Sequence, residues 1–288
     1  MGNENLNRAK RVKNDEFYTL YDDVKNEILN YKSQLEGRTI YCNCDSIESN
    51  FWKFLHHNFK ELKLKKLICT FYNPDGASYR SEYDGTGNDD DYTDCVQTAL
   101  QGDGDFHSAE CLAIMKGADI VITNPPFSKF RLFFSDLMEN KKEFLIIGSA
   151  NAISYKDVFY YIKDGFVNIG YNNISKFYNS ETAPQCRWFT TLRVNKKPFV
   201  LSLTAPFDEH KYQKYDFFDA INCNSIKDIP KNYNGIIGVP ITFLDKYPNA
   251  LFELTDIVYN GARVTPSCGM FYVNGIKKYN RLFIQRKK

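Results

Sequence analysis

Short apolar runs alternate with amphipathic stretches along the first two-thirds of this chain. The apolar runs predict buried strands at 39–42, 66–71, 118–123, 144–147, 167–171 and 188–194. Apolar positions at helical spacing predict an extended entry followed by a helix within 15–35, and helices near 50–55, 108–116, 130–138 and 156–162. Alternation of strands and helices at this spacing is typical of an α/β fold, with a doubly wound, mostly parallel sheet joined by right-handed crossovers.

Three other stretches break this rhythm. The first 14 residues are polar, and we expect them to be flexible. Residues 73–94 are rich in Gly, Asp, Tyr and Ser and predict a solvated acidic loop, because their Gly and Glu positions do not fit an EF-hand. Beyond Pro198 the sequence becomes irregular and tyrosine-rich, with short strands. We therefore predict a flexible segment at 1–14, an α/β domain at 15–198 and a smaller region at 199–288.

The composition is that of an ordinary globular protein, with 43% hydrophobic and 25% charged residues among 288. No apolar run approaches the ~20 residues that cross a bilayer, and the polar N-terminus has no apolar signal core. We expect a cytoplasmic protein with no membrane partner.

Cysteine and histidine spacing gives no metal site. The eight cysteines form no CxxC pair, and the four histidines form no HExxH motif. Cys42 and Cys69 fall inside predicted strands, where free buried thiols are the simplest interpretation. We expect no metal.

The strongest chemical signal is Asn124-Pro125-Pro126-Phe127, directly after the predicted strand 118–123. Proline restricts the residue before it to extended backbone, so the Asn124 side chain projects beyond the strand end, where ligands of open α/β sheets bind. The Asn124 and proline carbonyl oxygens can accept hydrogen bonds from an NH2 group, and Phe127 can stack on its ring. This arrangement suits a nucleobase amine. The alternative is a simple turn between strand and helix.

Together with other segments, this motif gives the chain a recognisable pattern. The chain resembles the EcoRI-type adenine-specific DNA methyltransferases over most of its length. The segments that carry the resemblance are 14–19 (NDEFYT), 41–45 (YCNCD), 49–52 (SNFW), 104–108 (GDFHS), 118–128 (ADIVITNPPFS) and 238–244 (GVPITFL).

The resemblance implies a Rossmann-like methyltransferase fold that binds S-adenosylmethionine. Its implied cofactor-binding residues are Phe17, Tyr18 and Thr19 at the methionine end, Tyr41, Cys42, Asn43 and Asp45 after the first strand, Phe51, Thr70 at the ribose, Asp105 and Phe106 at the adenine, and Asn124. Asp45 could pair with the α-ammonium group, or could cap the following helix. The first turn has no GxG, as in the EcoRI-type variant, and a cofactor without pyrophosphate needs no phosphate-binding loop.

The implied catalytic residues are Asn124, Pro125, Pro126 and Phe127. The target adenine must be flipped out of the duplex, because its amino nitrogen cannot reach a buried methyl donor while stacked. Asn124 and the Pro125 carbonyl would accept hydrogen bonds from that amine, and Phe127 would stack on the base. Trp188 or Phe189 could supply the second stacking face, or could simply be core aromatics.

Charge is unevenly distributed around a net +2. Residues 80–105 carry eight acids against one arginine, whereas 200–288 carry twelve Lys/Arg against eight Asp/Glu. A basic C-terminal region can face phosphates, so we expect double-stranded DNA as the partner and 199–288 as a target-recognition region. The basic end could also be a solvated tail.

We therefore expect a site-specific DNA adenine methyltransferase that serves restriction–modification or protects a phage or mobile element. A cognate restriction endonuclease is a possible partner that the activity would not require. Two alternatives stay open from the residues alone. One is a methyltransferase that acts on a protein glutamine or an RNA amine, and the other is a non-catalytic nucleic-acid-binding relative.

Overall fold

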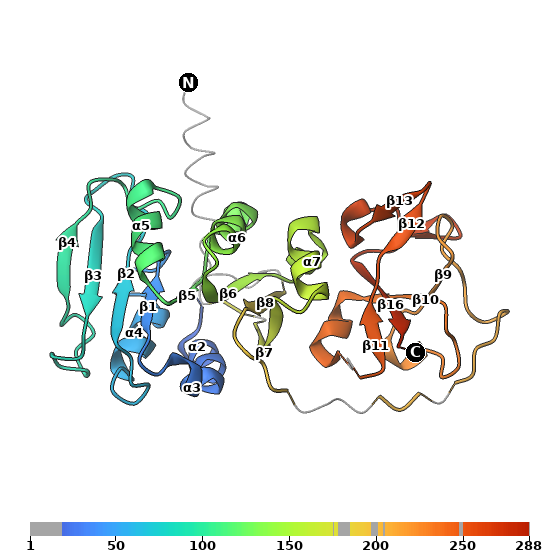
Figure 1. Ribbon diagram of the computed structural model, residues 1–288, viewed down its shortest axis with the longest axis horizontal. Coiled ribbons are helices and arrows are strands. Elements are labelled where there is room, and N and C mark those ends of the chain that lie inside the picture. The colour runs from blue at the N-terminus through green and yellow to red at the C-terminus, as the bar shows by residue number, and fades with distance from the viewer. Residues whose placement is uncertain are drawn as a thin grey trace, which may run out of the picture. The chain divides into compact units, whose positions relative to one another are not determined.

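The computed structural model describes residues 19–174, 176–177, 185–196, 201–203, 205–247 and 250–287 (Figure 1). They form two compact units. The first contains the described residues up to Ser149 together with Asn168–Val194, and the second contains Ala150–Val167 and the described residues from Asn195 onward. The predicted flexible segment 1–14, Phe17 and Tyr18 lie outside the described residues.

An eight-stranded sheet organises the first unit, in the order β4-β3-β2-β1-β5-β6-β8-β7. The bounds are β1 Thr39–Cys42, β2 Lys66–Cys69, β3 Tyr79–Tyr83, β4 Val96–Ala99, β5 Ile120–Thr123, β6 Glu143–Ser149, β7 Asn168–Ile174 and β8 Cys186–Thr190. The central strands β2, β1, β5 and β6 are parallel, whereas the pairings at both edges are antiparallel. The predicted α/β class is confirmed, but the sheet is mixed rather than mostly parallel, because the parallel strands are confined to its centre.

The strand order reverses between β1 and β5. From β1 the chain continues to β2 on one side, and it later returns to β5 on the other side. Ile40 and Tyr41 lie beside Ile120 and Val121, so the two strands end next to each other. We call the carboxyl ends of β1 and β5 the switch point, because open α/β sheets bind ligands where the strand order reverses.

Helices cover both faces of this sheet (Figure 1). One face carries α2 (Tyr21–Ile28), a 3₁₀ turn (Leu29–Tyr31), α3 (Lys32–Leu35) and α4 (Asn50–His57), and the other carries α5 (Ala109–Gly117) and α6 (Phe130–Glu139). Successive strand side chains point to opposite faces, so Ile40 and Ile122 pack with α2 and α4. The predicted helices are confirmed, and Ser49 caps α4 by accepting from the Trp52 N–H at 3.1 Å.

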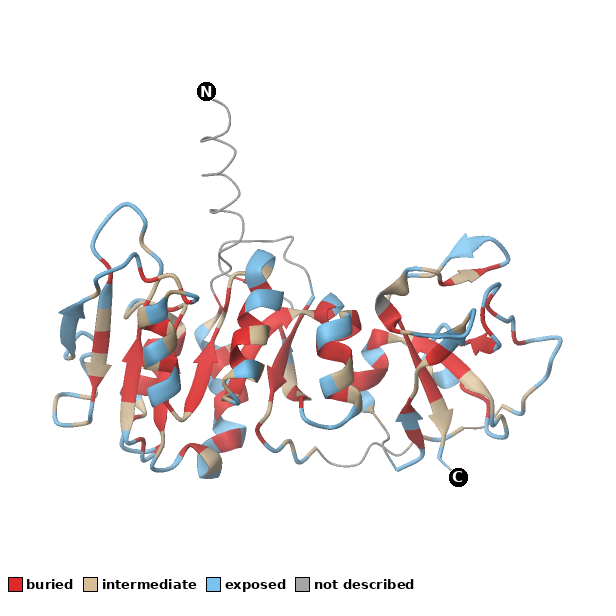
Figure 2. Cartoon of the chain, turned by 45° about the horizontal axis from the view of Figure 1, so that its top comes forward, coloured by how far each residue is buried: buried red, intermediate tan, exposed pale blue. Residues whose placement is uncertain are grey.

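The acidic loop prediction is wrong for part of its length. Tyr79–Tyr83 forms β3, which pairs antiparallel with β2, and β4 extends the edge further. Ser81 and Tyr83 point inward and are buried, while Glu82 on the other side pairs with Lys66 and Arg80. The strand thus pairs its charges on the face opposite Ser81 and Tyr83, which hides the alternation in the sequence. Figure 2 shows the central strands buried and β4 exposed.

The second unit is built from short strands around an aromatic core. It contains a 3₁₀ turn (Ala150–Ser154) and α7 (Lys156–Lys163), then a four-stranded sheet in the order β11-β16-β10-β9. The sheet strands are β9 Ala220–Asn222, β10 Ile236–Pro240, β11 Phe252–Leu254 and β16 Arg281–Arg286. Two hairpins pair β12 (Ile257–Tyr259) with β13 (Ala262–Val264), and β14 (Tyr272–Val273) with β15 (Ile276–Lys277).

Three further 3₁₀ turns lie at Ile226–Asp228, Ile241–Lys246 and Pro266–Cys268. Tyr215, Phe218, Phe271 and Phe283 pack together at the centre of this unit. No helix in the described parts of either unit is long and apolar enough to span a membrane.

Candidate active site

A hydrogen-bonded network joins the two strand ends at the switch point. The buried Asp45 follows β1, and its Oδ2 accepts from the Thr123 hydroxyl and, at 3.4 Å, from the Asn124 N–H. The Thr123 oxygen in turn accepts from the Cys44 N–H at 3.2 Å. Thr123 therefore fixes the turn after β1 against the residue that begins the Asn-Pro-Pro-Phe motif. Thr123 is a site residue that was not predicted from the sequence, although it is the last residue of the predicted strand 118–123.

Asp45 is a buried carboxylate without a cationic partner among the described residues. Burial raises the pKa of Asp45 to about 6, against hydrogen bonds from Thr123, the Asn124 backbone and Ser49 that lower it. A charge that is costly to bury is stabilised when an opposite charge binds beside it. The geometry at the end of β1 therefore suits a ligand that carries a positive charge.

Asn43 is a second polar group at this strand end. Its side chain is 1% exposed, and neither Oδ1 nor Nδ2 has a hydrogen-bond partner in the described part of the chain. An unpaired buried amide costs about 1–3 kcal/mol. The residues after β1 thus offer a donor, an acceptor and a carboxylate, which fit a polar, cationic ligand such as an amino acid.

Asn124 is oriented by a residue that precedes α2. The Asn124 Nδ2 donates to Thr19 Oγ1 at 3.3 Å, and Asn50 Nδ2 donates to the Thr19 carbonyl at 2.8 Å. Thr19 is buried, so this contact is shielded from water. Because the amide nitrogen is directed to Thr19, Oδ1 is the acceptor that Asn124 contributes to chemistry. The structure thus brings Thr19, Asn124 and Asp45 together.

The prolines carry the chain away from β5 in extended backbone. Pro125 is buried and Pro126 is half-buried with φ −60° and ψ 127°, after which Phe127–Lys129 forms a 3₁₀ turn that leads into α6. The Phe127 ring is half-buried and lies edge-on to Phe177, with ring centroids 6.2 Å apart. The motif is therefore rigid at the prolines and places an aromatic ring directly after them.

Asp105 lies on a loop that is held to the end of β2. Gly104 has φ +78°, and a Cβ there would meet the Phe71 carbonyl at 2.1 Å, so only glycine fits. Asp105 Oδ2 accepts from Lys129 Nζ at 2.8 Å. Burial acts to raise the pKa of Asp105, but the hydrogen bonds from Lys129 and the His107 N–H outweigh it and lower that pKa.

Lys129 connects this loop to the turn after Phe127. Its Nζ lies 5.5 Å from the centroids of both the Tyr72 and the Phe106 rings. The sequence analysis did not identify Lys129. A cation two residues after Phe127 was visible, but its partner 24 residues earlier was not.

The remaining predicted cofactor residues lie beneath the switch point as packed side chains. Tyr41 and Thr70 are fully buried, and their hydroxyls share a hydrogen bond of 2.6 Å. Cys42 and Phe51 belong to the core cluster on the α2 and α4 face, and Phe106 packs on Phe133 with ring centroids 5.1 Å apart. Buried, packed side chains such as these can form the walls of a binding site, but they offer few free hydrogen-bonding groups.

Trp188 and Phe189 are also buried. Trp188 packs against Phe51 with ring centroids 5.7 Å apart, and Phe189 packs against Phe130 at 5.4 Å. Both rings are therefore packed as core aromatics.

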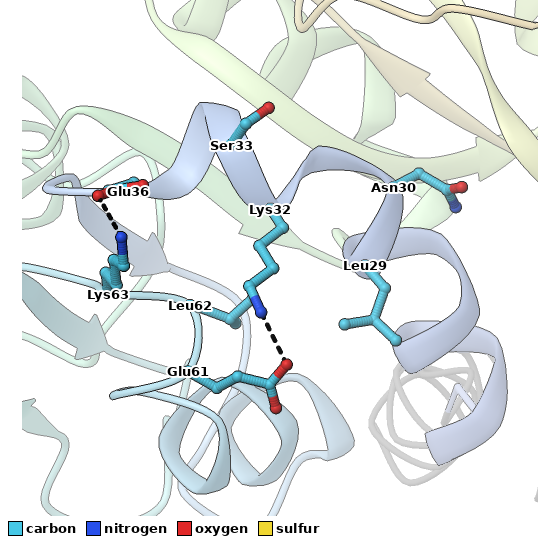
Figure 3. A pocket seen from close by; sticks show the side chains of 8 residues that line it. All are labelled: Leu29, Asn30, Lys32, Ser33, Glu36, Glu61, Leu62 and Lys63. Atoms are coloured by element: carbon cyan, nitrogen blue, oxygen red, sulfur yellow. Dashed lines mark hydrogen bonds and ion pairs between the residues drawn. The ribbon is translucent and has the colours of Figure 1, made fainter.

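A cavity of about 390 Å³ lies elsewhere in the first unit, lined by Leu29, Asn30, Lys32, Ser33, Glu36, Glu61, Leu62 and Lys63 (Figure 3). Lys32 pairs with Glu61 and Lys63 with Glu36, each at 2.8 Å. The cavity's charges are matched within the protein, and it contains none of the predicted site residues.

The fold and the switch point together define an α/β enzyme of the Rossmann-like methyltransferase class, with an amide-proline-proline-aromatic motif at its centre. The family model for the adenine-specific methyltransferase EcoRI matches residues 5–287. The chain belongs to this family of adenine-specific methyltransferases. The predicted enzyme class is thereby confirmed.

Three curated relatives match nearly the whole chain. The type II methyltransferase M.EcoRI of Escherichia coli is 37% identical, over 99% of this chain and 97% of its own length. M.MgeORF184P of Mycoplasma genitalium is 36% identical, over 98% and 99% respectively. M.MpnI of Mycoplasma pneumoniae is 36% identical, over 88% and 86%. No solved structure gave a significant match.

Proposed function

We propose that this enzyme transfers a methyl group from S-adenosylmethionine to the exocyclic amino nitrogen of an adenine flipped out of double-stranded DNA. The observation that carries the proposal is the hydrogen-bonded network of Asp45, Thr123 and Asn124. It places a carboxylate that lacks a cation beside an oriented amide. The adenine-specific family and the type II relatives support a role in restriction–modification, or in protecting a phage or mobile element.

The proposed cofactor supplies a methyl group activated by a sulfonium centre. Asp45 would bind its α-ammonium group, with a charge-assisted hydrogen bond that relieves the cost of burying the carboxylate. The Asn43 amide would satisfy its own donor and acceptor on the same amino-acid end. Asp105 would accept from the adenine amine of the cofactor, which requires Lys129 to share or release that carboxylate.

Packed side chains would form the walls of the cofactor site. These side chains are buried, so they would contribute the shape of the site rather than hydrogen bonds to the cofactor. They are Tyr41, Cys42, Phe51, Thr70 and Phe106.

The target adenine would be held by the motif itself. Asn124 Oδ1 and the Pro125 carbonyl would accept the two amine hydrogens, which draws the nitrogen lone pair out of conjugation and aims it for in-line displacement. The Phe127 ring would stack on the base. No strong general base is needed, because the proton can leave after methyl transfer.

The DNA would be engaged by the region 199–288, which carries the excess of basic residues. With double-stranded DNA as its substrate, the enzyme would act in the cytoplasm, and we propose that it needs no partner endonuclease for activity. A protein glutamine, an RNA amine or a non-catalytic role is not favoured, because the family that the chain belongs to is adenine-specific and enzymatic.

Substitution of Asn124 tests the proposal. We expect Asn124→Ala to reduce the methylation rate about a thousandfold or more, the cost of losing a positioned hydrogen-bond acceptor in the transition state. S-adenosylmethionine affinity, measured by calorimetry, should stay within a few-fold. Asn140→Ala is the matched control, since the Asn140 amide bonds locally to the Asp136 carbonyl of α6. Methylation by Asn124→Ala at the wild-type rate would refute the proposal.

A further inference from the structure

The second unit contains a polar cavity of about 180 Å³ beside β9, several times the ~30 Å³ that one water occupies in the liquid. Its lining residues come from the segment before β9, from β9 itself and from the turn that follows. They are Ala205, Lys211, Tyr212, Gln213, Asn222, Asn224, Lys227 and Asp228. None of them belongs to the proposed methyl-transfer site.

A chain of hydrogen bonds fixes what the two asparagines of this cavity can offer a ligand. Tyr215 donates to Asn222 Oδ1 at 3.0 Å, and Asn222 Nδ2 donates to Asn224 Oδ1 at 3.1 Å. Arg281 Nη2 also donates to Asn224 Oδ1, at 3.0 Å. Both lone pairs of that oxygen are therefore occupied by protein donors. The group that Asn224 can present to a ligand is its Nδ2, a donor.

Tyr212 lines the cavity, and its buried hydroxyl is a second donor. Tyr212 is 7% exposed, and its hydroxyl has no hydrogen-bond partner among the residues that the structure describes. Burial, followed by the nearby Cys223, Asp228 and Asp208, raises the pKa of Tyr212, so the hydroxyl keeps its proton. A phenylalanine would give the same packing against Phe207 without an unpaired polar atom. The hydroxyl is thus explained by a ligand acceptor.

Charged groups of both signs lie near these donors: two lysines at the cavity, Asp228 in its lining and Asp208 close to the Tyr212 hydroxyl. Lys211 and Lys227 are exposed at the edge of the cavity, and neither forms an ion pair with any described residue. Lys214, two residues from Tyr212, is different, because Asp219 binds its ammonium group at 2.9 Å. One carboxylate, Asp228, lines the cavity against the two lysines. The site therefore has an excess of donors and of positive charge, which suits an anion with several acceptor oxygens.

We propose that this cavity binds a backbone phosphate of the DNA substrate. The proposal rests on the proposed function, since it assigns a contact to the DNA that the enzyme methylates. Lys211, Lys227, the Tyr212 hydroxyl and Asn224 Nδ2 would surround the two non-bridging oxygens. Phosphate contacts fix register and add affinity, but they carry no sequence information. The cavity would therefore position the duplex on the second unit without choosing the target site.

The test measures DNA affinity at several salt concentrations for wild type, Tyr212→Phe, Lys211→Ala and Lys227→Ala, with full-length enzyme. We expect Tyr212→Phe to bind about tenfold more weakly, the effect of losing a hydrogen bond to a charged group. Each lysine variant should reduce the slope of log affinity against log salt by about 0.9. These losses should be equal on duplexes with and without the methylation site.

A structural role would not produce the same pattern. Tyr212→Phe should unfold at the same or a higher denaturant concentration than wild type, and its kcat at saturating DNA should stay within about twofold while KM for DNA rises. Lys214→Ala is the matched control and should bind DNA like wild type, because its charge is already paired.

Wild-type affinity in Tyr212→Phe and in both lysine variants would overturn the proposal. The proposal would also be overturned if the cavity bound free phosphate instead of DNA. In that case inorganic phosphate would stabilise wild type but not Tyr212→Phe, and DNA binding would be unchanged in the variant. Failure of the proposed function would give a different result from failure of the phosphate site. In that case wild type itself would bind DNA without salt dependence or would not methylate DNA.

Discussion

Two buried carboxylates of the first unit have different surroundings. Glu27 in α2 accepts four hydrogen bonds, from the Tyr31 hydroxyl at 2.8 Å, from the backbone N–H groups of Tyr171 at 2.7 Å and Asn172 at 2.8 Å, and from Asn172 Nδ2 at 2.9 Å. Asp45 accepts from Thr123, from Ser49 and, at 3.4 Å, from Asn124. Burial raises the pKa of both carboxyl groups.

The difference separates a structural joint from a binding group. Glu27 ties α2 to the edge strand β7 so closely that a Cβ on Gly170 would lie 2.3 Å from its carboxylate oxygen. Its four donors come from the protein itself. Asp45 lies at the switch point with fewer hydrogen bonds, one of them as long as 3.4 Å, and a cationic ligand would complete its surroundings. A buried charge is therefore informative about function only after its donors are counted.

The largest effect on stability should come from Glu27→Ala. The variant leaves several buried donors without an acceptor, and we expect the free energy of unfolding to fall by about 3 kcal/mol in urea titrations at pH 7.5. The methylation kcat of the folded fraction should not change. Glu61→Ala, which removes an exposed ion pair with Lys32, should change stability by less than about 1 kcal/mol. Equal losses in the two variants would refute the distinction.

Asp45→Asn should change the free energy of unfolding in the opposite direction. Removing a buried charge whose pKa is raised to about 6 should stabilise the ligand-free protein at neutral pH by about 2–3 kcal/mol, at 1.36 kcal/mol per pKa unit. The same variant should bind S-adenosylmethionine at least tenfold more weakly, because the partner of the α-ammonium group is lost. Calorimetry and urea titration measure both. A variant that is less stable than wild type at neutral pH, or that keeps wild-type affinity, would contradict the role given to Asp45.

The stability gained by Asp45→Asn should depend on pH. With a folded pKa of about 6 and an unfolded pKa near ~4, the native state holds the Asp45 proton more tightly. Its protonation therefore stabilises the fold below pH ~4, and this contribution is lost as the pH rises through about 6. Asp45→Asn should match wild type near pH 4 and exceed it increasingly up to pH 7. A difference that is independent of pH would exclude titration of Asp45.

The smallest effect should follow from Lys129→Met. The pair with Asp105 is partly exposed, so we expect stability to change by less than about 1 kcal/mol and kcat/KM to fall only a few-fold. Lys116→Met, on the exposed side of α5, is the control and should leave kcat/KM unchanged. A thousandfold loss in Lys129→Met would place Lys129 among the catalytic groups instead.

The central strands could be predicted from sequence because each is a short run that is buried on both faces, as in Ile120–Thr123. Strand β3 could not be predicted, since only Ser81 and Tyr83 of its five residues are buried and its acidic neighbours resemble a loop. In the second unit the strands are two to six residues long, too short for periodicity to define them.

The site residues that directly follow predicted strands could be predicted from the sequence. Asn124 and Asp45 follow buried runs, so both were expected near a ligand. Their contact through Thr123 joins residues 78 apart in the chain and depends on the pairing of β1 with β5, which no local pattern contains. For the same reason, the pairing of Lys129 with Asp105 appears only in the folded chain.

The most direct test of the central claim is to map methyl groups on DNA after incubation with the purified enzyme and S-adenosylmethionine carrying a labelled methyl group. We predict label on the exocyclic nitrogen of adenine within one fixed sequence context, and a labelling rate about a thousandfold lower when Asn124→Ala replaces the wild type. Label on cytosine or on protein, or adenine methylation by Asn124→Ala at the wild-type rate, would contradict the account.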